Sequence, residues 1–164
     1  MAEDVRQAIR EFTCINCWHM NPGESAAMWS LYSPNYGIAI RSTIGRLIKS
    51  FRSSPIPIKI GAVRYLNFEA LRRSEAAALH SWRFVKRKSF EHEKELRAAI
   101  LEPDVSKLDL SGLAVDVDVP VLIERVFVSP TLDSWVAQMV EEELKLYDLH
   151  DLVVHSSLYS KNLD

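Results

Sequence analysis

Segments with the two-residue alternation of β-strands are interleaved along the whole chain with segments that have the 3.6-residue period of helices. The clearest helical segment follows Ser129-Pro130-Thr131 and runs to residue 147. Its apolar positions recur on one helix face and are Leu132, Trp135, Val136, Met139, Val140 and Leu144. This interleaving predicts an α+β fold with a mixed, mostly antiparallel sheet of about six strands and three to four helices.

The same patterns give bounds for the predicted elements. Strands are expected over 12–18, 36–41, 58–65, 93–101, 112–119 and 123–128, with a last short one over 152–155. Helices are expected over 24–32, 43–51, 67–88 and 129–147. No repeat or long linker divides the sequence, so we expect a single domain over 1–164, with an extension over 1–11 and a tail over 156–164.

Composition excludes several classes of protein. The chain of 164 residues is 48% hydrophobic and 26% charged, as in ordinary globular domains. Its formal net charge of −2 gives no general attraction to nucleic acid or acidic membranes. No apolar run approaches the ~20 residues that a membrane-spanning helix needs, and two cysteines make no disulfide framework. These features favour a cytoplasmic protein.

Residues 17–40 gather aromatic and titratable side chains. His19, Glu24, Trp29 and Tyr32 are candidates for the wall of a binding site, because His exchanges protons near neutral pH and aromatic rings stack on ligands. The alternative is that Glu24 is only an acid at a helix start and Trp29 only a core residue. Both interpretations stay open at the level of sequence.

A second candidate group lies on the strand predicted over 93–101. Alternation puts Glu93, Glu95 and Arg97 on one face, where an ion-pair ladder would keep the acids ionised. Such carboxylates suit a role in orienting a ligand better than a role as general acid. The alternative is a row of solvated charges. The cations Arg83, Lys86, Arg87 and Lys88 precede this strand, and they would meet a phosphate or form a solvated helix face.

Two possible metal sites are disfavoured. Cys14, Cys17 and His19 have zinc-ligating side chains, but a strand points Cys14 to the face opposite Cys17 and His19. Asp116 and Asp118 could hold a divalent ion, yet paired acids on an edge strand usually face solvent. We therefore expect no metal site, and the sequence leaves any cofactor unknown.

Several of these motifs occur together in one known family. The chain resembles a bacterial domain of unknown function, family 2971, from Cys17 to about Tyr159. The shared motifs are Cys17-Trp18-His19, Glu24 to Tyr32, Gly37 to Ile40, Lys86-Arg87, Glu93 to Arg97, and Val126 to Pro130 with Trp135.

The resemblance also implies a difference. Full-length members carry a segment before the Cys-Trp-His strand, where this sequence has only Met1 to Glu11. We expect its lack to leave a sheet edge or apolar face uncovered. The sequence thus predicts a homodimer, with the Cys14 strand or the Trp135 helix at or near the interface.

Two hypotheses for function follow. The first is an enzyme, or a domain derived from one, that acts on a nucleotide-like ligand; its Glu-x-Glu is similar to the motif with which ADP-ribosyltransferases hold NAD. Its catalytic residues would be His19, Glu93 and Glu95, and its ligand-binding residues Glu24, Trp29, Tyr32, Arg87 and Arg97. The second is a non-catalytic protein-interaction module, for example an accessory protein of defence systems or mobile elements.

Overall fold

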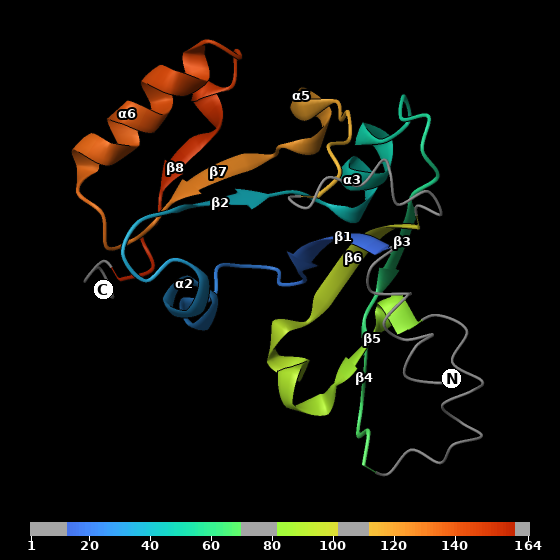
Figure 1. The fold of residues 1–164 in the computed structure, drawn as a ribbon. Helices are drawn as coiled ribbons and strands as arrows, with labels where there is room; N and C mark the ends of the chain where they lie inside the picture. The colour runs from blue at the N-terminus through green and yellow to red at the C-terminus, as the bar shows by residue number, and fades with distance from the viewer. Residues whose placement is uncertain (1–12, 70–81, 102–111, 160–164) are drawn as a thin grey trace. The chain divides into compact units, whose positions relative to one another are not determined.

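The described residues of the computed structural model, 13–69, 82–101 and 112–159, belong to two compact units (Figure 1). Unit 1 comprises Met1–Asn21 and Ser54–Val115, and unit 2 comprises Pro22–Ser53 and Asp116–Asp164. Both units contain strands and helices, which confirms the predicted α+β class. Instead of one sheet, the described strands form three, and most of their pairings are antiparallel, as expected.

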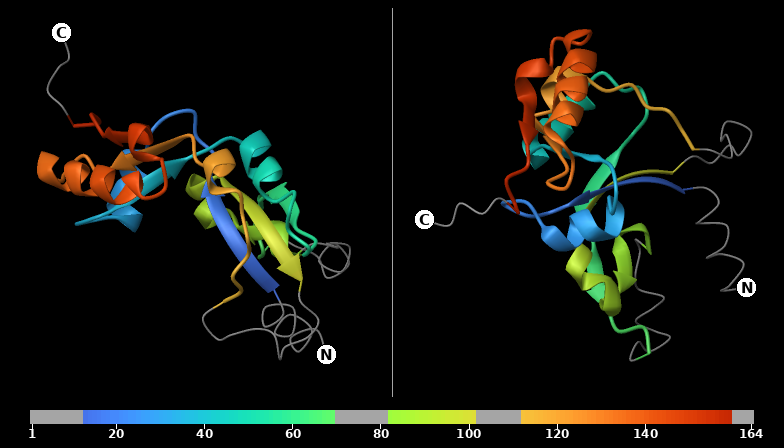
Figure 2. Two further views of the ribbon diagram at one scale, coloured as in Figure 1. Left: turned by 90° about the horizontal axis from the view of Figure 1, so that it is seen from above. Right: turned by 90° about the vertical axis from the view of Figure 1, so that its left-hand side faces the viewer.

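Unit 1 is built on a three-stranded antiparallel sheet with β6 (Glu95–Leu101) in the centre. Strand β1 (Thr13–His19) pairs along its whole length with β6, and the two run side by side in both views of Figure 2. Strand β3 (Lys59–Ala62) pairs with the other edge of β6. Strand β6 is the central strand, and its Leu96, Ala98, Ala99 and Ile100 are all buried.

A second, two-stranded sheet of unit 1 lies next in the chain. The strand predicted over 58–65 is interrupted at Val63, whose amide donates to the Glu95 carbonyl, so that β4 (Arg64–Leu66) starts a new sheet. Strand β4 pairs in parallel with β5 (Val85–Arg87), which follows the 3-10 helix η1 (Trp82–Phe84). The 3-10 helix η2 (Lys88–Glu93) then leads into β6.

Unit 2 contains the mixed sheet β2-β7-β8. Strand β7 (Arg125–Val128) lies between β2 (Ile38–Arg41), which is antiparallel to it, and β8 (Val153–His155), which is parallel. Helix α6 (Ser134–Lys145) contributes to the core of this unit, and the 3-10 helix η4 (His150–Leu152) leads into β8. The core residues are Ile123, Val126 and Leu149, packed against Val140, Leu144, Leu152 and Val153.

Three short helices of unit 2 begin at a side-chain cap, as amide groups in a first helical turn require. The Ser25 hydroxyl accepts from the Met28 amide at the start of α2 (Ala26–Tyr32), and Thr43 caps α3 (Ile44–Ser50) in the same way. The helices predicted over 24–32 and 43–51 therefore start within two residues of the observed ones. The third cap is Asp118, at α5 (Val119–Leu122).

Three further predicted elements differ from the structure. Of the helix expected over 67–88, residues 70–81 lie outside the described residues, and 85–87 form a strand because they pair with β4. The strand expected over 112–119 is wrong: residues 113–118 form no strand, and Asp118 with Pro120 starts the helical turn α5. The last helix begins at Ser134, five residues later than expected, because Asp133 rather than Ser129 is its N-cap.

Among the residues that the structure describes, no helix is both long enough and apolar enough to cross a membrane.

Candidate functional site

The pairing of β1 with β6 brings four polar side chains of unit 1 to one sheet face. Cys17 lies opposite Arg97 and His19 lies opposite Glu95, and directly paired residues of antiparallel strands share a face. Cys14 lies opposite Ile100 on the other face, as the alternation predicted. The spacing of two residues on each strand thus builds the group Cys17, His19, Glu95 and Arg97.

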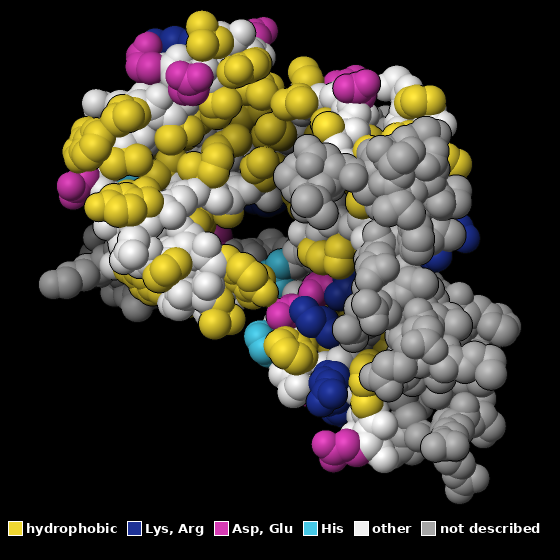
Figure 3. Space-filling view, viewed as in Figure 1, with side chains coloured by type: hydrophobic (Ala, Val, Ile, Leu, Met, Phe, Trp, Pro, Cys, Tyr) yellow, Lys and Arg dark blue, Asp and Glu magenta, His cyan; other side chains and the backbone are white. Residues whose placement is uncertain are grey.

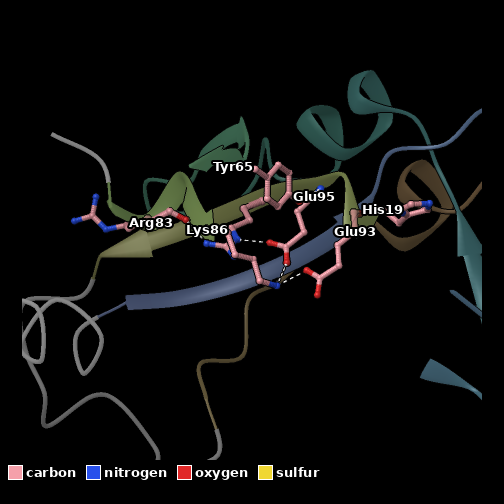
Figure 4. A network of polar contacts seen from close by, with 7 residues as sticks. His19, Tyr65, Arg83, Lys86, Glu93 and Glu95 are labelled. Atoms are coloured by element: carbon pink, nitrogen blue, oxygen red, sulfur yellow. Dashed lines mark hydrogen bonds and ion pairs between the residues drawn. The ribbon is translucent and has the colours of Figure 1, made fainter. Parts of the chain in front are cut away.

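The carboxylates of this face are held in a buried ion-pair network (Figure 4). Arg97 Nε donates to Glu95 Oε2 at 2.5 Å, and Lys86 Nζ lies 2.7 Å from Glu95 Oε1 and also pairs with Glu93. Glu93, Glu95 and Arg97 are only 6%, 7% and 8% exposed. The predicted ladder therefore exists, and it is buried rather than solvated.

Glu93 joins this network from a helix and not from the strand. It is the last residue of η2, and Lys94, with φ of 40°, turns the chain into β6. This turn leaves the Glu93 carboxylate on Lys86 and directs the Glu93 carbonyl toward β1. The prediction that Glu93, Glu95 and Arg97 all lie on one strand is thus wrong for Glu93. The carboxylate of Glu93 nevertheless joins the same network as the other two side chains.

His19 is fixed by the same turn. Its Nδ1 lies 2.6 Å from the Glu93 carbonyl oxygen, which can only accept a hydrogen bond, so Nδ1 carries the hydrogen. In the neutral ring Nε2 then has a lone pair, and no described residue is hydrogen-bonded to it. His19 is half-buried. Its Nε2 is available as a proton acceptor for a bound molecule.

The network keeps Glu95 ionised. Burial alone would raise the pKa of this carboxyl, but its hydrogen bonding with Glu93, Arg97 and Lys86, together with the Arg97 charge, outweighs burial and lowers the pKa to about 2. Burial opposes the charged form of Lys86 as well, yet its bonds to Glu93 and Glu95 raise the pKa of the amine. Glu95 is therefore a fixed anion and not a proton donor.

Cys17 is not an activated thiol. Burial raises the pKa of its thiol, and the Glu95 charge raises it further against the opposing effect of Arg97. Because the thiolate is the reactive form of cysteine, this position lacks the environment of a nucleophile.

Three residues that sequence reasoning did not assign to the site support it. Tyr65 in β4 accepts a hydrogen bond from the Glu95 amide through its hydroxyl, at 2.7 Å. The Lys86 ammonium lies 4.8 Å from the centre of the Phe90 ring, which is itself exposed. From sequence alone, Lys86 is one of four cations that would meet a phosphate or form a solvated helix face. In a strand over 85–87, Lys86 and Arg87 point to opposite sides. A strand prediction for this segment would therefore have separated the roles of the two cations.

The other cations near the network have separate partners. Arg87 is exposed and lies 5.8 Å from the Phe68 ring centre, and Phe68 packs edge-on against Trp82. Arg83 bonds to Thr13 through Nε, while its carbonyl accepts from Arg97. Lys88 is solvated, with a loose contact to Glu91 at 3.9 Å.

The remaining predicted site residues belong to unit 2. The Glu24 carboxylate accepts from Trp29 Nε1 at 3.0 Å and from the Ser156 hydroxyl at 2.5 Å. Trp29 is 8% exposed, whereas Tyr32 on the same helix is 65% exposed. Within unit 2, Glu24 and Trp29 thus join α2 to the segment after β8. The prediction that they form one site with His19 and Glu95 stays a prediction, because the two groups belong to different units.

No family model, curated protein or solved structure matches this chain. The resemblance to family 2971 therefore stays a prediction. Within the described ranges, no group of three or more His, Cys, Asp and Glu side chains is arranged to hold a metal ion.

Proposed function

We propose that unit 1 binds a nucleotide-like ligand beside His19 and the Glu93–Glu95 pair, as an enzyme or as a domain derived from one. The observation that carries this proposal is the His19 ring, oriented by the Glu93 carbonyl at 2.6 Å and with no described residue hydrogen-bonded to its Nε2, on the strand that pairs with the one bearing buried Glu95. A histidine fixed in this way is suited to exchange a proton with a ligand hydroxyl or amine.

Each part of the proposed site has a separate role. Glu95, held ionised by Arg97 and Lys86, would accept hydrogen bonds from ribose-type hydroxyl groups. The exposed Phe90 ring offers a surface on which a base can stack. Lys88 is an exposed cation two residues before Phe90 and would meet phosphates, whereas Arg87 points to the side opposite Lys86 and lies on Phe68. In this proposal Arg97 is a positioning residue, and Glu24 and Trp29 are structural.

The test is ligand-observed NMR with NAD and ATP at millimolar concentration. NAD comes first because of the likeness of Glu93-Lys94-Glu95 to the Glu-x-Glu motif of ADP-ribosyltransferases. We expect saturation transfer to both nucleotides, reduced in His19→Gln and Phe90→Leu. Glu91→Gln is the matched control, since Glu91 is an exposed acid on the same helix η2.

The outcomes separate the versions of this proposal. Release of nicotinamide from NAD, lost in His19→Gln, would identify an enzyme. Nucleotide binding without any turnover would identify an enzyme-derived domain. No transfer to either nucleotide, or equal loss in Glu91→Gln, would refute the site. His19→Gln leaves the ion pairs of the network intact, so a loss of nucleotide binding in this variant would not result from unfolding.

A second candidate function is a protein-interaction module that acts in the cytoplasm, as a homodimer or with another protein. The observation that favours it is the number of large apolar side chains exposed in unit 2, which include Leu31, Tyr32, Ile38, Ile48, Trp135, Met139 and Leu146. Contiguous exposed apolar patches mark interaction surfaces, and Trp135, Met139 and Leu146 lie in one short stretch of the chain.

A further inference from the structure

Helix α6 carries an apolar stripe on the side that the core of unit 2 does not use. Ala137, Val140 and Leu144 face the core, whereas Trp135, Met139 and Leu146 are 56%, 59% and 76% exposed. At 3.6 residues per turn, these three positions fall within about 40° of arc on the helix. Their spacing of four and seven residues is that of a helix that packs against another helix.

The stripe is set in acidic surroundings. Between residues 133 and 151 the sequence has six acidic side chains against one lysine. Glu142 lies in the stripe itself, between Met139 and Leu146, and the single lysine, Lys145, pairs with it at 2.6 Å on the surface. Figure 3 shows acidic and hydrophobic side chains next to one another along α6.

We propose that this stripe is a docking surface for a basic amphipathic helix of another protein. Such a helix would lay apolar residues on Trp135, Met139 and Leu146 and would place a lysine or arginine opposite Glu142. From Trp135 to Leu146 the surface extends ~17 Å, which about three turns of helix would cover. The proposal does not depend on the ligand proposed for unit 1.

Charge decides against two other occupants. In a two-fold contact between copies of α6, Glu142 and Glu143 would face their own counterparts, and like charges brought together are destabilising. An anionic membrane surface would likewise repel this acidic helix. A cationic amphipathic helix would be stabilised both by the apolar stripe and by the acidic side chains around it.

The experiment measures binding of two labelled helical peptides by fluorescence anisotropy. Both peptides carry the same leucine stripe, and one has lysines where the other has glutamates. We expect the lysine peptide to bind and the glutamate peptide not to bind. The double variant Trp135→Ser/Met139→Ser should weaken binding at least tenfold, whereas Ile44→Ser, a similarly exposed apolar change on α3, should leave it unchanged.

A charge reversal tests the central contact. Glu142→Lys should strongly weaken binding of the lysine peptide. Glu141→Lys makes the same change of net charge on another side of α6 and should weaken this binding only slightly. Equal effects of the two reversals would show general attraction of charge and would overturn the proposal. No binding of the lysine peptide, or self-association abolished by Trp135→Ser/Met139→Ser, would also overturn it.

Discussion

Arg97 is the residue on which the network of unit 1 depends most. It neutralises the buried Glu95 through Nε and also donates to the Arg83 carbonyl. Removing one partner of a buried ion pair leaves a charge without compensation, although Lys86 still contacts Glu95. We expect Arg97→Ala to lower the free energy of unfolding by about 3 kcal/mol in urea titration.

The matched change is Lys88→Ala, which removes a cation from a solvated contact of 3.9 Å. Surface pairs of this kind contribute at most about 1 kcal/mol to stability, so the urea midpoint of Lys88→Ala should stay close to that of the wild type. Equal midpoints for Arg97→Ala and the wild type would mean that the network adds nothing to stability.

The low pKa of Glu95 makes stability depend on pH in a defined range. Its folded-state pKa of about 2 lies below the ordinary value of 4.5, so the folded state favours the ionised form. This contribution is fully present above pH 4.5 and is lost as the pH falls toward 2; it is on the order of 3 kcal/mol. Urea titrations between pH 6 and 2 should show the decline. Glu95→Gln should flatten it, and Glu91→Gln should not.

At the scale of residues, sequence alone predicted the pairing of Arg97 with Glu95 and the common face of Cys17 and His19. Both follow from strand alternation, which is a local property. Lys86 and Tyr65 as partners of Glu95 could not be predicted, because each reaches it from another strand. Contacts of that kind depend on which strands are neighbours, and a periodic pattern does not contain this information.

At the scale of elements, the link between α2 and the segment after β8 rests on one carboxylate. Glu24 accepts from both Trp29 Nε1 and the Ser156 hydroxyl, and Ser156 is buried. Glu24→Ala would leave two donors without this acceptor, at about 1–3 kcal/mol for a buried group. We expect a lower thermal midpoint and a red shift of tryptophan emission. Glu141→Ala, which changes only an exposed acid on α6, should do neither.

The elements that sequence predicted well are those with a start signal in the chain. Ser25 and Thr43 are good N-caps, and the predicted starts of α2 and α3 lie within two residues of the observed ones. The strand at 85–87 was not predicted, and the strand predicted over 112–119 is wrong, because neither segment has such a signal at its start. Three residues are too few for a period to be visible, and the alternating valines at 115, 117 and 119 lead into a turn that Asp118 caps.

At the scale of the whole molecule, the expected homodimer has a place on unit 1. Among the described residues β1 pairs only with β6 and none of them forms a strand on its other edge, and Ile15 on this strand is exposed. Acidic α6 is the less suitable of the two interfaces considered, since it would face itself. We therefore expect the dimer contact to lie along the Cys14 strand.

Sedimentation at micromolar concentration tests this prediction. The wild type should sediment as a dimer of the 18.7 kDa chain. Ile15→Lys should give a monomer, because a lysine on an edge strand opposes pairing with a second edge. Trp135→Ser/Met139→Ser should remain dimeric, because it changes only α6. A wild-type monomer would exclude the dimer altogether, and a dimer lost only in the α6 variant would move the interface to α6 and contradict the assignment of that helix to a basic partner.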